Sequence, residues 1–364
     1  MRILFVHTIG RKKYGGGERW VVNAASGLQQ IGHHCIIAGK GNSIFFEKAM
    51  DQGLETFDIN IFSDISIYHA LKLSHFIKKH KIDVVISKRR DLAVAGLAAR
   101  WGGRLPVIVR SGSPPQKSLR KHVFLISKLA DGLVTNTKTI RDIYRANALP
   151  DDNFIKVIYN GMLIDDDVSA FDFYARHPGR SIVLCVGRLN AVQKGYIYLI
   201  DALQALKNDY PDLLVYILGD GKDSRMLENL ANRKGVKEMI VFAGYVDQPA
   251  PYMKGCDVFL HPSLIEGMPN AAMEAMAYGK PVIMTNVNGA AELSLDGKLA
   301  QIIPPASHTA IAETLKKVLD KPKEFEPMAR AAKKHVRSHY TFEIMIAALD
   351  DFISAKAKAK AKLG

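Results

Sequence analysis

The sequence predicts an α/β protein built from two doubly wound, Rossmann-like domains. Apolar segments of strand length alternate with helical segments of ten or more residues, as in parallel βαβ units. The alternation lapses once, in an acidic stretch with Pro and Gly near residues 165 to 180, and then begins again. At 364 residues, the chain also exceeds the usual size of a single hydrophobic core. We therefore expect two sheets, each covered by helices on both faces.

The first half opens with an apolar strand, residues 2–7, followed by an amphipathic helix. The apolar positions Val21, Ala24, Ala25 and Leu28 of this helix follow helical spacing. Further strands are expected at residues 35–40, 83–88, 106–112, 132–137 and 154–161, with helices at 71–81, 92–102, 119–130 and 138–147.

The second half repeats the pattern. Strands are expected at residues 181–189, 213–221, 239–246, 256–263, 280–286 and 299–305. We expect an N-terminal domain over residues 1–165, a C-terminal domain over 166–340, and a terminal helix with a Lys/Ala tail over 341–364. The terminal helix is expected to cross back toward the first domain. The tail is of low complexity and is predicted to be frayed or disordered.

Composition narrows the class of protein. No apolar run reaches the length of a spanning helix, and the opening MRILFVHTIG suits a first strand better than a signal peptide, so a cytoplasmic location is expected. The cysteines Cys35, Cys185 and Cys256 lie in apolar, strand-like contexts without metal-ligand spacing. They are predicted to be buried, reduced thiols.

Positive charge is concentrated in the first half. Residues 1–165 hold 25 Lys and Arg against 13 Asp and Glu, whereas residues 166–352 hold 21 against 23. This asymmetry favours an anionic surface or substrate facing the first domain. Zinc spacing and an aromatic RNA-binding signature are absent from the sequence, so a nucleic-acid partner is not expected.

The segment KSLRKHVFLISKLA, residues 117–130, mixes cations with bulky apolar side chains, as a helix at the inner face of an anionic membrane would. An ordinary amphipathic crossover helix has the same pattern, and both interpretations stay open.

The most informative stretch is HPSLIEGMPNAAMEAMAYGKPVI, residues 261–283. Glu266 lies in a loop, and Glu274 lies one turn inside a helix for which Asn270 is the expected N-cap and Gly279 the expected end. A helix start after a strand is where α/β proteins hold phosphorylated ligands. A carboxylate beside a phosphate suits that place only if it accepts hydrogen bonds from ligand hydroxyls, which points to a nucleotide sugar.

Two further loops favour a diphosphate. The segment YGGGE, residues 14–18, allows close approach of backbone amides at a helix start, although a plain turn could also use glycine. Arg188 and Lys194 follow a strand in VGRLNAVQKG and suit a diphosphate clamp better than solvated surface charge. The dinucleotide motif GxGxxG is absent from both first loops, which disfavours an oxidoreductase.

Together these motifs resemble the retaining, GT-B-fold glycosyltransferases of family four, also called glycosyl transferases group 1. The resemblance covers nearly the whole chain, including GGGERWVVNAASGLQQIGH, CVGRLNAVQKG, VYILGDG and IEGMPNAAMEAMAYGKPVIMTNVNGAAEL. It implies the GT-B architecture, in which two Rossmann-like domains face each other across a cleft that holds the donor.

The resemblance also implies roles for single positions. Glu274 would bind the ribose hydroxyls and Glu266 the hydroxyls of the donor sugar. Arg188 and Lys194 would hold the diphosphate and, with Glu266, form the catalytic set. The other donor-binding positions implied are Gly16, Gly17, Gly219, Tyr245, Val246, Gly267, Met268 and Asn270.

The chain departs from the family after two strands of the first domain. Where relatives often carry histidines, this sequence has KRRD at residues 88–91 and RSGS at residues 110–113. We expect one of Lys88, Arg89, Arg90 and Asp91 to contact the donor sugar. Arg110 and Ser111 are expected to face the acceptor.

The expected activity is retaining, metal-independent transfer of a sugar from a UDP-linked donor to a glycan or lipid-linked acceptor in cell-surface polysaccharide or lipopolysaccharide synthesis. No cofactor is expected. A nucleotide-sugar epimerase of the same fold and a non-catalytic nucleotide-sugar-binding protein are the alternatives.

Overall fold

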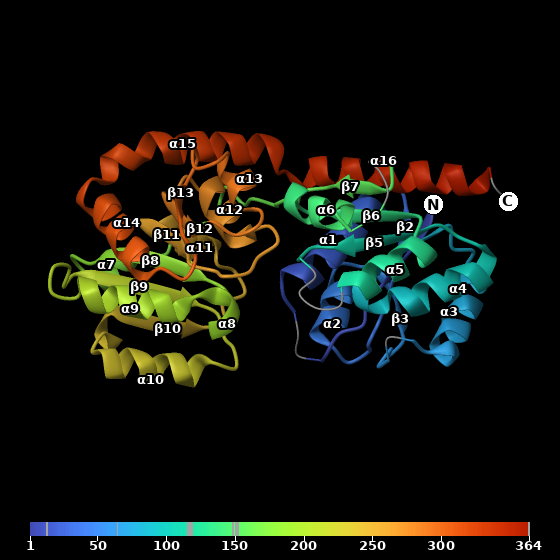
Figure 1. Ribbon diagram of the computed structural model, residues 1–364, viewed down its shortest axis with the longest axis horizontal. Helices are drawn as coiled ribbons and strands as arrows, with labels where there is room; N and C mark the ends of the chain where they lie inside the picture. Colours follow the sequence, from blue (N-terminus) through green and yellow to red (C-terminus); the bar gives the residue numbers. More distant parts are fainter. Residues whose placement is uncertain (12–13, 64, 115–118, 148, 150–152, 363–364) are drawn as a thin grey trace. The chain divides into compact units, whose positions relative to one another are not determined.

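The computed structural model describes the whole chain except residues 12–13, 64, 115–118, 148, 150–152 and 363–364 (Figure 1). It divides into two compact units. The first comprises Met1–Gly161 together with Phe342–Gly364, and the second comprises Met162–Thr341. The chain thus leaves the first unit after Gly161 and returns to it at Phe342.

The first unit contains a seven-stranded parallel sheet of order β3-β2-β1-β4-β5-β6-β7. Its strands are β1 (Arg2–Val6), β2 (His34–Gly39), β3 (Glu55–Asp58), β4 (Val84–Lys88), β5 (Val107–Ser111), β6 (Gly132–Thr135) and β7 (Ile155–Val157). Residues pair in register, for example Leu4 with Ile36 on one side and Val85 on the other. The order reverses between β1 and β4, as in doubly wound folds.

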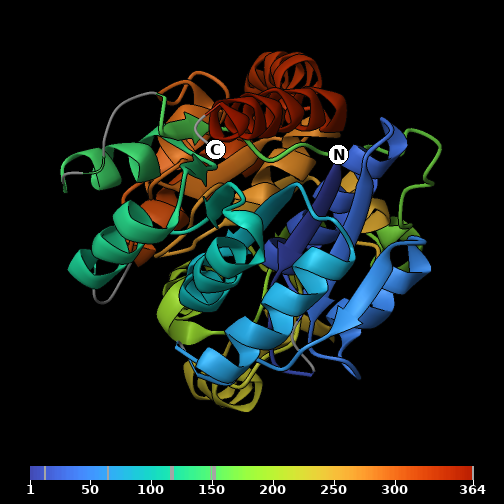
Figure 2. The same ribbon diagram turned by 90° about the vertical axis from the view of Figure 1, so that its right-hand side faces the viewer.

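Helices cover both faces of this sheet (Figure 2). Alternate strand residues point to opposite faces, so each face has its own core. One core includes residues of α3 (Ile67–Lys79), α4 (Leu92–Gly103), α5 (Leu119–Leu129) and α6 (Lys138–Arg145). The other includes residues of α1 (Gly16–Gln30), α2 (Ile44–Asp51) and α16 (Phe342–Ala361). A short helix, η1 (Arg89–Asp91), joins β4 to α4.

One helix and the strand that follows it in this unit were not expected from the sequence. Helix α2 and strand β3 lie in residues 41–66, which carry no sustained periodicity. Helix α2 has only eight residues and β3 only four, of sequence ETFD. Elements this short show too few repeats for a pattern to be recognised.

The prediction of a frayed or disordered Lys/Ala tail was wrong up to Ala361. Helix α16, red in Figure 1, is continuous through the repeated Ala-Lys pairs. The Lys356 ammonium donates to the Asn153 carbonyl at 2.6 Å, and the Lys360 ammonium pairs with Asp131 at 2.5 Å. The tail is a good helix former, and the first unit supplies the acceptors that hold it.

The second unit contains a six-stranded parallel sheet of order β10-β9-β8-β11-β12-β13. Its strands are β8 (Ser181–Val186), β9 (Leu213–Leu218), β10 (Ile240–Gly244), β11 (Val258–His261), β12 (Val282–Thr285) and β13 (Gln301–Ile303). The prediction of two Rossmann-like domains is confirmed.

The helices of the second unit again lie on both faces of its sheet. Residues of α9 (Tyr196–Leu206), α10 (Ser224–Lys234) and α14 (His308–Asp320) belong to one core. Helix α12 (Asn270–Ala277) contacts β11, β12, α11 (Ala250–Gly255) and α15 (Pro322–His339). The remaining helices are α7 (Phe173–Arg176), α8 (Ala191–Lys194), η2 (Lys237–Met239) and α13 (Ala290–Ser294).

The three cysteines are buried and free, as predicted. Burial raises the pKa of Cys35 and of Cys256 to about 12, so neither thiol is a ready nucleophile. Among the described residues, none of the helices combines the length and the apolar character needed to cross a membrane.

Candidate functional site

The candidate residues of the second unit gather where the order of its sheet reverses. Strands β8 and β11 are neighbours in the sheet although they are far apart in the chain. Such a reversal leaves a crevice outside the carboxyl ends of the two strands, and ligands of open α/β sheets bind there. Arg188 and Lys194 follow β8, and Glu266 follows β11.

Glu266 is the centre of a cluster of three charged or polar side chains. Its Oε1 atom accepts a hydrogen bond from the Lys194 ammonium and lies 3.0 Å from His261 Nε2. Lys194 and Glu266 side chains are 20% and 16% exposed, and His261 is nearly buried. The structure therefore brings Lys194, expected to hold the diphosphate, into direct contact with Glu266, expected to bind the sugar hydroxyls.

Electrostatics fix the protonation states in this cluster. Burial raises the pKa of Glu266, but the hydrogen bond from His261 and the charge of Lys194 outweigh it and lower the pKa to about 2. Burial lowers the pKa of His261, which Glu266 offsets only in part. Glu266 is thus ionised at neutral pH and only accepts hydrogen bonds, so His261 donates to it through Nε2.

The second carboxylate oxygen of Glu266 is left for a ligand. Within the part of the chain that the structure describes, no hydrogen bond reaches Oε2. The Glu266 carbonyl accepts from the Asn288 side chain at 2.5 Å, which holds the loop in place. An ionised oxygen with free lone pairs beside a bound cation can accept a hydrogen bond from a hydroxyl group.

Gly195 sets the position of Lys194. It has a φ of +65°, and a Cβ atom there would lie 1.9 Å from the Pro262 carbonyl oxygen. Only glycine allows this close approach between the loop after β8 and the loop after β11. The approach brings the lysine to Glu266, 72 residues further along the chain.

Helix α12 begins within this cluster's loop and carries Glu274 on its second turn, where the side chain is half-buried. The expected capping role of Asn270 is not observed, because the helix begins at Asn270 itself and the N-cap is Pro269, which offers no side-chain acceptor. Gly267 and Met268 are buried just before the helix start. The first amides of a helix lack intrahelical acceptors and suit an anion.

The other donor-binding candidates lie at neighbouring strand ends. Arg188 is exposed, and its guanidinium makes no ion pair or hydrogen bond with the described residues. Gly219 follows β9 and donates its N–H to the Gly244 carbonyl at 2.7 Å. Tyr245 is 63% exposed, and its hydroxyl donates to Asp247 at 3.0 Å. Val246 next to it is half-buried.

The first unit has a second cluster, again at the reversal of its sheet. Glu18, in the first turn of α1, accepts from His7 Nε2 at 3.0 Å and from the Lys88 ammonium at 3.3 Å through Oε1. Its Oε2 accepts from the Gly15 N–H at 3.0 Å. Burial raises the pKa of Glu18, but His7 and Lys88 outweigh it and lower the pKa to about 2.

The glycine loop is in direct contact with this cluster. A Cβ atom at Gly17 would lie 2.5 Å from the Lys88 Nζ atom, so the glycine makes room for the lysine. Gly16 is the first residue of α1. The predicted glycine loop is therefore bound to the end of β4 through Glu18 and Lys88.

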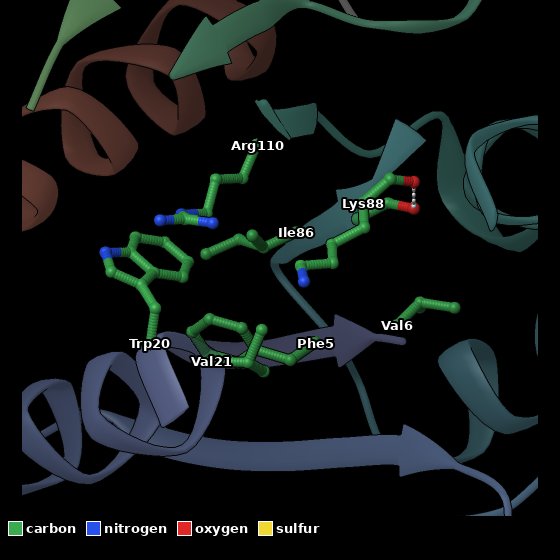
Figure 3. A pocket seen from close by; sticks show the side chains of 8 residues that line it. Phe5, Val6, Trp20, Val21, Ile86, Lys88 and Arg110 are labelled. Atoms are coloured by element: carbon green, nitrogen blue, oxygen red, sulfur yellow. Dashed lines mark hydrogen bonds between the residues drawn. The ribbon is translucent and has the colours of Figure 1, made fainter. Parts of the chain in front are cut away.

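Two further site candidates, Asp91 and Arg110, are buried. Asp91 accepts from the Thr8 hydroxyl at 2.5 Å and the Thr8 N–H at 3.1 Å. Arg110 lies with its guanidinium carbon 4.1 Å from the centroid of a Trp20 ring and donates to Asn160 Oδ1 at 3.0 Å. Figure 3 shows Arg110 above the Trp20 ring and Lys88 across from them.

Ser111 completes the predicted set at the end of β5. Its hydroxyl lies 3.1 Å from the Tyr144 hydroxyl and is buried. Lys88 and Arg110 also border a small hollow of about 10 Å³, enough for one water molecule.

The sequence analysis missed His7, Glu18, Trp20 and His261. His7 and His261 each follow or end a sheet-centre strand, so their place after an apolar run was a usable signal. Glu18 stood inside the quoted YGGGE motif without a role. Trp20 had no signal, because an aromatic on an amphipathic helix is usually core.

The described residues hold no group of three or more His, Cys, Asp or Glu side chains arranged for a metal ion. Metal independence stays a prediction.

Comparison with known proteins follows the same division of the chain. The family described as Glycosyltransferase Family 4 matches residues 14–165, and the family described as Glycosyl transferases group 1 matches residues 169–335. The chain belongs to the GT-B glycosyltransferases of group 1.

Relatives of this glycosyltransferase vary in function. It is 28% identical over 232 residues to a glycogen synthase of Mycobacterium tuberculosis, covering 62% of this chain and 55% of that protein. It therefore spans about half the length of that relative. It is 26% identical to the lipopolysaccharide core biosynthesis glycosyltransferase LpsE of Rhizobium meliloti, covering 84% of this chain and 86% of that protein.

Solved structures show the same fold. A glycosyltransferase from Rickettsia africae has a TM-score of 0.86 at 20% identity, covering 98% of both chains. Anabaena Alr3699/HepE, solved in complex with UDP, has a TM-score of 0.85 at 20% identity, covering 98% of this chain and 100% of that one.

The low pKa of Glu266 makes its contribution to stability depend on pH. Because the folded pKa of about 2 lies below the unfolded value, the ionised group stabilises the fold above about pH 4.5, and this is lost as the pH falls toward 2. Glu266→Gln should lower the free energy of unfolding at pH 7 by at most about 3 kcal/mol. The difference from wild type should shrink between about pH 4.5 and 2.

Urea unfolding followed by circular dichroism at a series of pH values measures this difference. Glu343→Gln, at an exposed position of α16, is the control and should show no such change. A deficit in Glu266→Gln that stays constant down to pH 2 would contradict the electrostatic origin.

Proposed function

We propose that this group 1 glycosyltransferase moves a sugar from a UDP-linked donor to a glycan or lipid-linked acceptor, with retention at the anomeric carbon and without a metal ion. The observation that carries the proposal is the Lys194–Glu266–His261 cluster beside the start of α12 at the reversal of the second sheet. The Lys194 ammonium and the start of α12 suit the diphosphate of a nucleotide sugar, and the open oxygen of Glu266 suits a hydroxyl group of its sugar.

The relatives support this choice of donor and process. Alr3699/HepE was solved with UDP-glucose, and an Escherichia coli relative, 29% identical over 240 residues, is a UDP-Gal-dependent galactosyltransferase acting on a diphosphoundecaprenol-linked sugar. The similarity to LpsE favours a role in cell-surface polysaccharide or lipopolysaccharide synthesis.

In the proposed complex, Arg188 and Lys194 bind the donor diphosphate. Both are cations at the carboxyl end of β8, and the exposed Arg188 makes no ion pair with the described residues. When the bond between the anomeric carbon and the diphosphate oxygen breaks, negative charge grows on the diphosphate. Lys194 is already held by its ion pair with Glu266, so it can stabilise that charge with little reorganisation and so lower the barrier, and Arg188 adds a second cation.

Glu266 is assigned to binding the sugar hydroxyls. A carboxyl with a pKa of about 2 is a weak proton acceptor at neutral pH. We therefore assign the proton of the attacking acceptor hydroxyl to an oxygen of the departing diphosphate. The new carbon–oxygen bond forms on the face that the diphosphate leaves, which retains the configuration.

Lys194→Ala tests the assignment of Lys194 to the transition state. Turnover should fall by about 10²–10³-fold, while the donor dissociation constant changes by less than about tenfold. The assay follows UDP release from the UDP-sugar that gives the largest rise in melting temperature, with lipid-linked glycan as acceptor.

Lys323→Ala, at an exposed position in α15, is the matched control and should behave as wild type. Equal losses in turnover and donor affinity in Lys194→Ala would indicate uniform binding instead. Conversion of the donor sugar without any acceptor would favour the epimerase alternative.

Glu274→Gln tests the assignment of that carboxylate to the ribose. Wild type should bind UDP more tightly than 2′-deoxy-UDP by about tenfold or more, because the ionised carboxylate accepts from the ribose hydroxyl. The variant should lose most of this preference, since an amide oxygen is a weaker acceptor. Calorimetric titration of both nucleotides into both proteins measures it. An unchanged ratio would place the ribose elsewhere.

A location at the inner face of an anionic membrane remains part of the proposal. In helix α5, Ile126 is the residue buried in the core, whereas Phe124 is 60% exposed beside several cations. Lys117 and Ser118 of the predicted segment lie outside the described residues. An exposed aromatic among cations suits a lipid interface.

Phe124→Ser should reduce binding to vesicles containing phosphatidylglycerol severalfold, because it removes the apolar contact. Co-sedimentation measures binding, and Tyr174→Ser, which also replaces an exposed aromatic residue, is the control. Binding that does not depend on the anionic lipid would contradict the membrane assignment.

A further inference from the structure

The reversal point of the first sheet carries more positive than negative charge. Two carboxylates, Glu18 and Asp91, lie there, together with four basic side chains. These four residues, which we call the first-unit cation group, are Lys88, Arg89, Arg90 and Arg110. Lys88 is the last residue of β4, Arg89 and Arg90 form η1, and Arg110 is near the end of β5.

Arg89 and Arg90 have only neutral, distant acceptors. Arg89 lies 3.4 Å from the Tyr144 hydroxyl and 3.4 Å from the Ser113 hydroxyl. Arg90 lies 3.5 Å from the Thr8 carbonyl. Hydrogen bonds of this length are at the weak limit for N–H donors. Over the described ranges of the chain, neither guanidinium pairs with a carboxylate.

Arg110 is more unusual, because it is 5% exposed and yet has an amide as its acceptor. Burial lowers the pKa of Arg110 to about 9, although Glu18 acts in the opposite direction. The guanidinium carries five N–H donors, and Asn160 Oδ1 takes one of them among the described residues. The indole N–H of Trp20, against which Arg110 stacks, also has no acceptor in that part of the chain.

Lys88 and Arg110 repel each other. Burial lowers the pKa of Lys88, and the charge of Arg110 lowers it further, while Glu18 raises it. Both side chains border the same small hollow with Trp20 (Figure 3). Glu18 and, more weakly, Asp91 offset part of this repulsion, and a further anion beside these two partly desolvated cations would offset more of it.

We propose that the first-unit cation group binds an oxyanion on a substrate sugar, either a carboxylate or a phosphate ester. A planar guanidinium with unused donors matches both oxyanions, because it can make two parallel hydrogen bonds. The inference rests on the proposed function, since it assumes that the substrates are sugars. It assigns to this chain a preference for acidic sugars over neutral ones.

The donor diphosphate is a weaker match for this group. The second unit already supplies Arg188 and Lys194 to a diphosphate under the proposed function. The charge excess at the first sheet therefore points to a different anionic group, carried by the donor sugar or by the acceptor.

Binding to matched acidic and neutral probes tests the proposal on the full chain. Calorimetry compares the affinities for UDP-glucuronate and UDP-glucose, and so tests whether the donor sugar carries the oxyanion. Saturation-transfer NMR compares glucuronate and glucose 6-phosphate with glucose, which gives the acceptor source. In at least one of these two arms, the dissociation constant of wild type for the acidic probe should be about tenfold or more below that for the neutral probe.

The variants are Arg90→Gln, which is exposed, and Arg110→Gln, which is buried. Each should weaken binding of the acidic probe about fivefold or more beyond any loss for the neutral probe, while affinity for UDP alone stays within about twofold. Lys79→Gln, exposed in α3, removes the same charge and should keep the preference. If Arg110→Gln fails to fold, Arg90→Gln and Arg110→Lys carry the test.

Three outcomes would overturn the inference. The first is that wild type shows no preference for an acidic probe in either arm. The second is that Lys79→Gln loses as much of the preference as the arginine variants do. The third is that the arginine variants lose affinity for UDP to the same extent as for the acidic probe. The last would mean that the group serves the diphosphate. A folded protein that binds no UDP at all would instead contradict the proposed function, and the acceptor arm would still decide the inference.

Discussion

Each unit is organised around a glutamate that stays ionised where little water reaches it. Glu18 accepts from His7 and Lys88, and Glu266 accepts from His261 and Lys194. A desolvated carboxylate is costly unless cations and donors surround it, so each glutamate requires its lysine and histidine nearby. This requirement joins segments far apart in the chain and fixes the shape of both loop regions.

Parallel sheet topology is what allows those segments to meet. In both units the strand order reverses at the centre of the sheet, so the loops that follow two non-consecutive strands begin side by side. Small residues then decide how near the loops come: Gly17 admits Lys88, and Gly195 admits the Pro262 carbonyl. The two units reach the same lysine–glutamate–histidine combination from different loops, with the glutamate on a helix in one and on a loop in the other.

Sequence reasoning predicted what repeats and missed what depends on tertiary contact. The two Rossmann-like domains followed from the alternation of strands and helices, but α2 and β3 were too short to show a period. Lys194 and Glu266 were each singled out as candidates, yet their ion pair depends on the approach at Gly195. The helical Lys/Ala tail was missed because its acceptors, Asn153 and Asp131, lie some two hundred residues away.

The return of the chain at Phe342 makes the second unit an insertion within the first. Residues 162–341 form a contiguous unit, whereas the core on one face of the first sheet contains Phe342, Met345, Ile346 and Leu349 of α16. During synthesis, the second unit can therefore complete its fold while one face of the first sheet is covered by α1 and α2 but still lacks α16. The unit whose residues are synthesised first is therefore the last to complete its fold. Until α16 emerges, the residues of α1 that pack against it form an exposed apolar surface that favours aggregation.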